Sequence, residues 1–182
     1  MSNFEFLKDK KEYALFAPAC MEAEKIYATA PAMCAVGCRK ALELAVKWVY
    51  AADNTMEMPY KDNLQSLVHE LSFRFAVDED TWGKFQFIIR LGNLAVHTER
   101  SVSMGDALAS LRALFEFVEW IDYCCGADYK ERTFDVSLIP EEKVVIDTKK
   151  IKELERVLTS ELGSKEDYER EYGNTPFGLL VR

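Results

Sequence analysis

Hydrophobic residues return at helical spacing over four or five stretches within the first 126 residues of the chain. Apolar positions three or four residues apart form one stripe of a helix, whereas strict alternation of apolar and polar residues indicates a strand. No clear alternation occurs before Thr133. The pattern therefore predicts an all-α, up-and-down helical bundle with short loops. The predicted helices span about 12–29, 32–51, 61–71, 78–97 and 104–125.

The residues at the ends of these stretches suggest where the helices begin and end. The first helix starts either near Glu12 or at Pro18, where the missing N–H of proline has no cost. Asp78 is a suitable N-cap for the helix at 78–97, and Gly126 ends the last one. In the helix at 61–71, the residues expected to face inward are Leu64, Leu67, Val68 and Leu71.

The stretch at 32–51 is apolar on nearly every side, which predicts a central position in the bundle. It also carries two interior charges of opposite sign, Arg39 and Glu43, which are four residues apart. One interpretation is an ordinary ion pair along the helix, worth a few tenths of a kcal/mol. Trp48 and Tyr50 are expected to close the end of this helix against the core.

The composition changes after residue 127, where prolines and mixed charges replace the regular apolar spacing. We therefore expect residues 1–127 to form the bundle and residues 128–182 to form a linker and a helical appendage. One face of that appendage carries an apolar stripe, formed by Ile151, Leu154, Leu158 and Leu162. We expect this stripe to be buried against the chain's own bundle or against a partner. The final residues, 177–182, are mostly apolar, and we expect the natural chain to continue past Arg182.

Composition narrows the classes of function. The hydrophobic fraction of 49% and charged fraction of 30% are typical of soluble globular proteins, and no apolar run approaches the ~18–20 residues that cross a bilayer. No secretory signal opens the chain, so we expect a cytoplasmic protein without membrane contact. The five cysteines include no Cys-x-x-Cys pair, and with two histidines they favour reduced thiols rather than zinc. No metal or cofactor is expected.

One stretch combines a basic group, an amide and an imidazole at helical spacing. At about 100° per residue, Gln86, Arg90, Asn93 and His97 fall within a strip about 60° wide along one edge of the helix at 78–97. A histidine beside an apolar face is more often a hydrogen-bonded structural residue than a catalytic one. Because the net charge is −8, a broad nucleic-acid groove is disfavoured, whereas a pocket for a single phosphate is not.

The string IRLGNLAVH (residues 89–97) contains an Arg-x6-His spacing with Asn93 inside it. It resembles the Arg-x(4–6)-His motif of the HEPN superfamily, which comprises all-α domains and includes metal-independent ribonucleases. The wording of this string, and of CRKALELAVKWVY (residues 38–50), is more similar to a domain-of-unknown-function branch found at the N-terminus of type I restriction-enzyme R subunits. The resemblance covers roughly residues 1–130.

The resemblance implies a homodimer and a set of roles at one phosphodiester. His97 would act as general acid or base, and Arg90 would hold the phosphate through its fork of donors. Asn93 would orient the imidazole or donate to the phosphate. Glu43, with Arg39 on the same helix, would support Arg90 from the central helix. The same Arg90–Glu43 pair is equally compatible with a buried structural latch, because buried charges must be paired.

Two hypotheses follow. The first is a non-catalytic accessory domain of a restriction-modification or related defence protein. It would mediate assembly or regulation, with the restriction-modification subunits as possible partners. The second is a HEPN-type ribonuclease or a module that contacts RNA or DNA phosphates through Arg90 and His97. Phosphate-binding loops, serine-hydrolase elbows and zinc-protease motifs are absent from the sequence. The acidic charge favours the first hypothesis.

Overall fold

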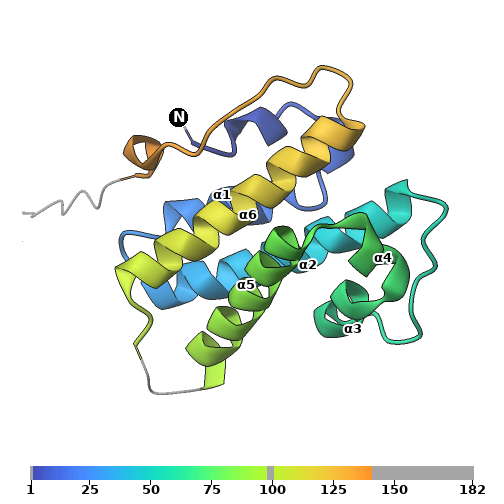
Figure 1. The fold of residues 1–182 in the computed structure, drawn as a ribbon. Coiled ribbons are helices and arrows are strands. Elements are labelled where there is room, and N and C mark those ends of the chain that lie inside the picture. Colours follow the sequence, from blue (N-terminus) through green and yellow to red (C-terminus); the bar gives the residue numbers. More distant parts are fainter. Residues whose placement is uncertain (1, 98–100, 141–182) are drawn as a thin grey trace, which may run out of the picture. The chain divides into compact units, whose positions relative to one another are not determined.

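The computed structural model describes residues 2–97 and 101–140, which form helices and no strand (Figure 1). The predicted all-α bundle is confirmed. The apolar stripe expected in the appendage, from Ile151 to Leu162, lies outside the described residues. The α-helices are α1 (Ala17–Lys25), α2 (Pro31–Ala52), α3 (Leu64–His69), α4 (Leu71–Ala76), α5 (Glu79–His97) and α6 (Met104–Cys125). Three short 3-10 helices are η1 (Glu5–Leu7), η2 (Lys11–Tyr13) and η3 (Val136–Leu138).

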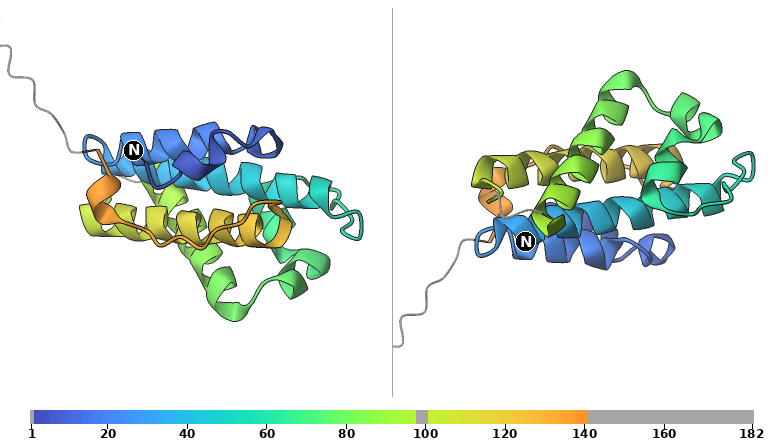
Figure 2. Two further views of the ribbon diagram at one scale, coloured as in Figure 1. Left: turned by 90° about the horizontal axis from the view of Figure 1, so that it is seen from above. Right: turned by 90° about the horizontal axis from the view of Figure 1, so that it is seen from below.

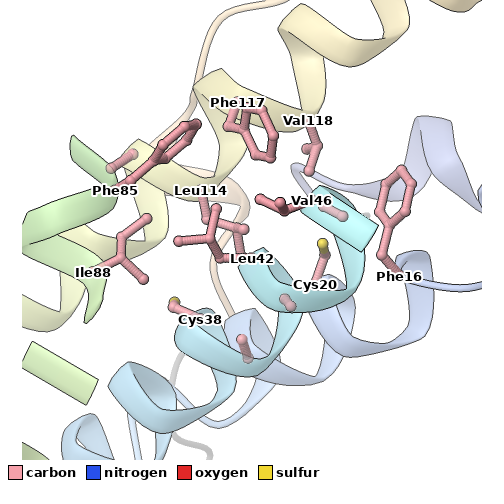
Figure 3. Packing of buried hydrophobic residues seen from close by; sticks show 14 of the residues in the cluster. Phe16, Cys20, Cys38, Leu42, Val46, Phe85, Ile88, Leu114, Phe117 and Val118 are labelled. Carbon is pink, nitrogen blue, oxygen red and sulfur yellow. The ribbon is translucent and has the colours of Figure 1, made fainter. Parts of the chain in front are cut away.

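Helix α2 is the centre of the bundle, as its all-round apolar pattern predicts. It packs against α1, α5 and α6, and Figure 2 shows α5 crossing it steeply while α1 and α6 run along it. Leu42 and Val46 project from α2 between Phe85 of α5 and Val118 of α6 (Figure 3). Cys20, Cys34 and Cys38 are free and buried in the same core. A helix surrounded on all sides needs apolar residues on all sides.

The predicted helix boundaries are largely confirmed by the caps that the structure shows. Pro18 lies in the first turn of α1, so of the two expected starts the later one is right. The carboxylate of Asp78 accepts a hydrogen bond from the N–H of Thr81 at 2.7 Å and caps α5. The hydroxyl of Ser103 accepts from the N–H of Asp106 at 3.0 Å and caps α6. Each cap satisfies a backbone donor that the helix leaves unpaired.

The prediction of one helix over 61–71 was wrong. Glu70 adopts an extended conformation (φ −61°, ψ 134°) that separates α3 from α4. Leu71, expected to face inward, therefore begins a new helix and is 65% exposed, whereas Phe73 becomes the buried residue of α4. Leu64, Leu67 and Val68 are buried as predicted. The period of the apolar residues is interrupted by the turn, so the stripe does not continue across it.

The chain after α6 runs back along the bundle rather than away from it (Figure 2). Residues 128–140, which the sequence assigns to the linker, contact the bundle at both ends of this path. Arg132 Nη1 donates to the carboxylate of Asp122 at 2.9 Å. Near the other end, the N–H of Asp135 donates to the side-chain carbonyl of Asn3 at 2.7 Å, and the amide of Asn3 donates to the carbonyl of Asp135 at 2.9 Å.

Asp122 is the fully buried carboxylate of α6. Besides Arg132, it accepts hydrogen bonds from the hydroxyl of Tyr13 at 3.0 Å and from the ammonium group of Lys10. Gly126 has φ −76°, so its role does not depend on a left-handed conformation. An added Cβ at Gly126 would lie 2.4 Å from Asp122 Oδ1 and 2.5 Å from the Asp122 carbonyl oxygen. The glycine that ends α6 is therefore needed for close approach to this carboxylate.

Candidate functional site

Helix α5 exposes the polar residues that the sequence singles out. Its buried residues, which hold it against the bundle, are Phe85, Ile88, Ile89, Leu91 and Gly92. Arg90, Asn93 and His97 are exposed, and Gln86 is half-buried at the edge of the apolar face. We call these four residues the α5 stripe. The helical register thus places them together, on the outer surface of the described unit.

Gly92 is the point at which α5 touches α2. An added Cβ there would lie 2.6 Å from Arg39 Cβ, 2.8 Å from Arg39 Cδ and 3.2 Å from the carbonyl oxygen of Ala35. Contacts below 3.0 Å do not occur in folded proteins without a shift of the neighbouring atoms. The aliphatic part of Arg39 is therefore packed onto the bare backbone of Gly92, and Arg39 does face α5 from the central helix.

The pair expected between Arg90 and Glu43 is not formed. Glu43 Oε1 accepts instead from Lys47 Nζ at 3.0 Å, along the same helix, and that hydrogen bond raises the pKa of Lys47. Lys47 also lies 3.7 Å from Asp62. Within the described residues, Arg90 has neither an ion pair nor a hydrogen bond from its side chain. Glu43 has a partner at shorter range, one turn away, so Arg90 is left to solvent.

Several buried donors near the stripe lack an acceptor. Arg39 Nε, Trp82 Nε1 and Gln86 Nε2 are buried and have no hydrogen-bond partner in the described part of the chain. Trp82 and Gln86 are one turn apart on α5, and Arg90 follows one turn later. A buried donor without an acceptor costs about 1–3 kcal/mol. The edge of the stripe thus holds three buried donors that no acceptor of the described residues satisfies.

The best-formed cavities of residues 2–97 and 101–140 lie away from the stripe. None of them is lined by Arg90, Asn93 or His97. The nearest in sequence lies between α5 and α6, has a volume of about 580 Å³ and is lined by Lys84 and Phe87. In this part of the chain, no group of three or more His, Cys, Asp and Glu side chains is placed to hold a metal ion.

A cavity that the sequence did not indicate lies where α2 and α6 end. It has a volume of about 570 Å³, and Trp48, Asp53 and Trp120 are among its lining residues. The sequence assigned Trp48 to the core and Asp53 to a turn. The signal that was available is that the predicted helices at 32–51 and 104–125 each carry a tryptophan within their last two turns.

Arg90→Ala should change the free energy of unfolding by no more than about 0.5 kcal/mol, since an exposed side chain without partners contributes little. Urea unfolding of the variant and of the natural sequence measures this. Arg132→Ala is the matched control, because it removes a partner of the buried Asp122 and should destabilise clearly. A loss of about 3 kcal/mol in Arg90→Ala would show instead that this side chain is a buried latch.

None of the described helices has the length and apolar character to cross a bilayer.

Comparison with known proteins gives one family. No curated protein and no solved structure matches the chain. The model of a family described as "Domain of unknown function (DUF4145)" matches residues 21–156, which include the whole of α2, α5 and α6. The chain therefore belongs to the DUF4145 family of domains of unknown function.

Proposed function

We propose that this chain is a non-catalytic interaction domain that binds a partner protein through the α5 stripe. The observation that carries the proposal is the open position of Arg90, Asn93 and His97, which are exposed on one edge of a helix rather than enclosed in a cavity. Their cationic and amide groups have no internal partners within the described residues. Such a surface suits an acidic partner surface, because complementary charge favours association and selects the partner.

Catalysis would require more than this surface supplies. A general base must be oriented, and the developing charge must be held in a site from which water is excluded. In the part of the chain that the structure describes, no hydrogen bond orients His97, and its side chain is exposed to solvent. The described unit taken alone therefore favours binding over chemistry.

The biological setting of the proposal comes from the sequence. Residues 38–50 and 89–97 resemble a branch found at the N-terminus of restriction-enzyme R subunits, and the family match is to a domain of unknown function. We therefore propose an accessory role in a restriction-modification or related defence protein, with a homodimer or another subunit as the partner. The dimer would form through α5 or α6, as the resemblance implies.

A second candidate is a HEPN-type metal-independent ribonuclease assembled at a dimer interface. One observation favours it: Glu43 is bound to Lys47, so the guanidinium of Arg90 is available to a phosphate. Seven residues along a helix separate Arg90 and His97 by about 10 Å at the backbone. An arginine side chain spans much of that distance, so both groups are able to reach one phosphate-sized anion.

RNA cleavage separates these two functions. Purified protein is incubated with labelled RNA and a metal chelator, and the expected result is no cleavage above that seen with His97→Ala. His69→Ala is the matched control, because His69 is the other histidine of the chain and is also exposed. Cleavage by the natural sequence and by His69→Ala, lost in His97→Ala with unchanged thermal stability, would establish the ribonuclease and refute the non-catalytic proposal.

Association is tested by light scattering at tens of micromolar protein. We expect a dimer that Arg90→Glu weakens, since the reversal removes the positive charge that the partner meets. Lys11→Glu is the matched control, because Lys11 is exposed on η2, far from α5 in sequence. A monomer at this concentration would refute the dimer, and equal weakening by both variants would refute a specific role for the stripe.

A further inference from the structure

The cavity at the ends of α2 and α6 is built from several elements of the fold. Helix α2 contributes its last two turns, the loop that follows contributes residues 53–56, α4 contributes Ala76, and α6 contributes its last two turns. The volume of about 570 Å³ is within the range of about 300–1,000 Å³ typical of small-molecule sites. Most of the lining is apolar, including Val49, Met56 and Ile121.

The charge of this cavity is negative. Among its lining residues, all of which the structure describes, Asp53 is the only carboxylate, and no lysine, arginine or histidine is present. Asp53 Oδ1 accepts from the hydroxyl of Thr55 at 2.6 Å and from its N–H at 2.8 Å. These hydrogen bonds lower the pKa of Asp53, so the carboxylate is ionised at neutral pH. Its second oxygen, Oδ2, has no hydrogen-bond partner within the described residues.

The ends of two long helices add to this negative potential. Helices α2 and α6 both end at the cavity, at Ala52 and Cys125. The last carbonyl groups of a helix carry a partial negative charge equivalent to about half an electron, which favours a cation nearby. The thiols of Cys124 and Cys125 add no charge of their own, because partial desolvation raises the pKa of both and keeps them neutral.

Two tryptophans line the same space and are held in place. Trp48 Nε1 donates to the carbonyl of Glu12 at 2.6 Å, and its ring meets that of Tyr13 edge-on at 5.2 Å. Trp120 is stacked on Phe117, with ring centroids 5.9 Å apart. Tryptophan is the aromatic side chain that attracts cations most strongly, above all quaternary ammonium groups. Fixed rings lose little entropy when a ligand binds.

We propose that this cavity binds a small organic cation with an apolar shell, such as a trimethylammonium group. Asp53 and the ends of α2 and α6 attract the charge, Trp48 and Trp120 contact the methyl groups, and Met56 and Ile121 complete the apolar wall. A metal ion or a lysine ammonium is disfavoured, because both are strongly hydrated and this cavity has few groups to replace their water. The site is independent of the α5 stripe and of the function proposed for it.

Tryptophan fluorescence measures binding directly. The chain has three tryptophans, so Trp82→Phe leaves the two that line the cavity as reporters. Choline is titrated into this variant, and 3,3-dimethylbutan-1-ol, which has the same shape without the charge, is the paired ligand. We expect choline to cause a saturable change in tryptophan fluorescence, and we expect the affinity for the alcohol to be at least about tenfold lower. Equal affinity for the two ligands, or no saturable change with choline up to millimolar concentrations, would overturn the proposal.

Two aspartates provide a matched pair of variants. Asp135 has the same local arrangement as Asp53: its Oδ1 accepts from the N–H and the hydroxyl of Ser137, at 2.8 Å and 2.7 Å. It does not line the cavity. Asp53→Asn should therefore weaken choline binding about tenfold while Asp135→Asn leaves it unchanged. Asparagine keeps an oxygen acceptor in both turns, so both variants should fold. Undiminished binding in Asp53→Asn would refute the role of the charge.

Alkylation of the cysteines gives a second, independent readout. Cys124 and Cys125 line the cavity and are exposed, whereas Cys20, Cys34 and Cys38 are buried. Choline should slow the labelling of Cys124 and Cys125 by a maleimide. Mass spectrometry of the peptides measures the extent of labelling. Unchanged labelling at saturating choline would place the ligand elsewhere and overturn the site. A peptide with trimethyllysine is then compared with its unmethylated form. Binding of the methylated form alone extends the ligand class to a protein-borne headgroup, and equally strong binding of both forms would contradict the role of the methyl groups.

Discussion

Replacing Asp122 with alanine should lower the free energy of unfolding by about 3 kcal/mol. The carboxylate is fully buried, and it is the common partner of Lys10, Tyr13 and Arg132. Its removal leaves both cations without a counter-charge, although their exposures of 18% and 22% allow partial rehydration. Urea unfolding measures the loss. Asp128→Ala, at an exposed position two residues past the end of α6's cap, should change stability by less than about 0.5 kcal/mol.

The same carboxylate makes stability depend on pH. Burial by itself would raise the pKa of Asp122, but the hydrogen bonds from Lys10, Tyr13 and Arg132 outweigh it and lower the pKa below its usual value. Its contribution is therefore complete above the unfolded-state pKa of about 3.9 and is lost as pH falls through the lower folded-state pKa. Below about pH 4, the natural sequence should lose stability more steeply than Asp122→Ala. Parallel curves for the two proteins would contradict this assignment.

Phe85→Ala should destabilise the fold by about 3–5 kcal/mol, the range for deleting a buried aromatic side chain. The ring is fully buried, with its centroid 4.6 Å from that of Phe117 on α6 (Figure 3). It also lies 5.9 Å from the ring centroid of Phe73, so it joins α5 to both α6 and α4. Thermal and urea unfolding measure the effect. Phe75→Ala is the matched control, because this ring is 84% exposed on α4, and its loss should cost less than about 0.5 kcal/mol. Similar losses in the two variants would mean that α4 does not pack as described.

The α5 stripe can be predicted from the sequence, whereas the cavity cannot. Arg90, Asn93 and His97 belong to one helix, so a period of 3.6 residues is sufficient to place them on one edge. The cavity residues Trp48 and Trp120 belong to helices that meet only in the folded chain. No local pattern relates two such positions, and their joint role follows from packing.

The sequence by itself determined the all-α class, the central position of α2 and the position of the α5 stripe along one edge of its helix. Each follows from the spacing of apolar residues along a helix, which is a local property. Tertiary structure decided the contacts between helices: Arg39 packs on Gly92, Glu43 pairs with Lys47 rather than Arg90, and Leu71 faces solvent. These contacts depend on which charged side chains lie within pairing distance in the folded chain and on the turn at Glu70. The spacing of apolar residues specifies neither. The burial of Asp122 also follows only from the tertiary structure. Its three partners come from segments before α1 and after α6, and folding brings them to one carboxylate.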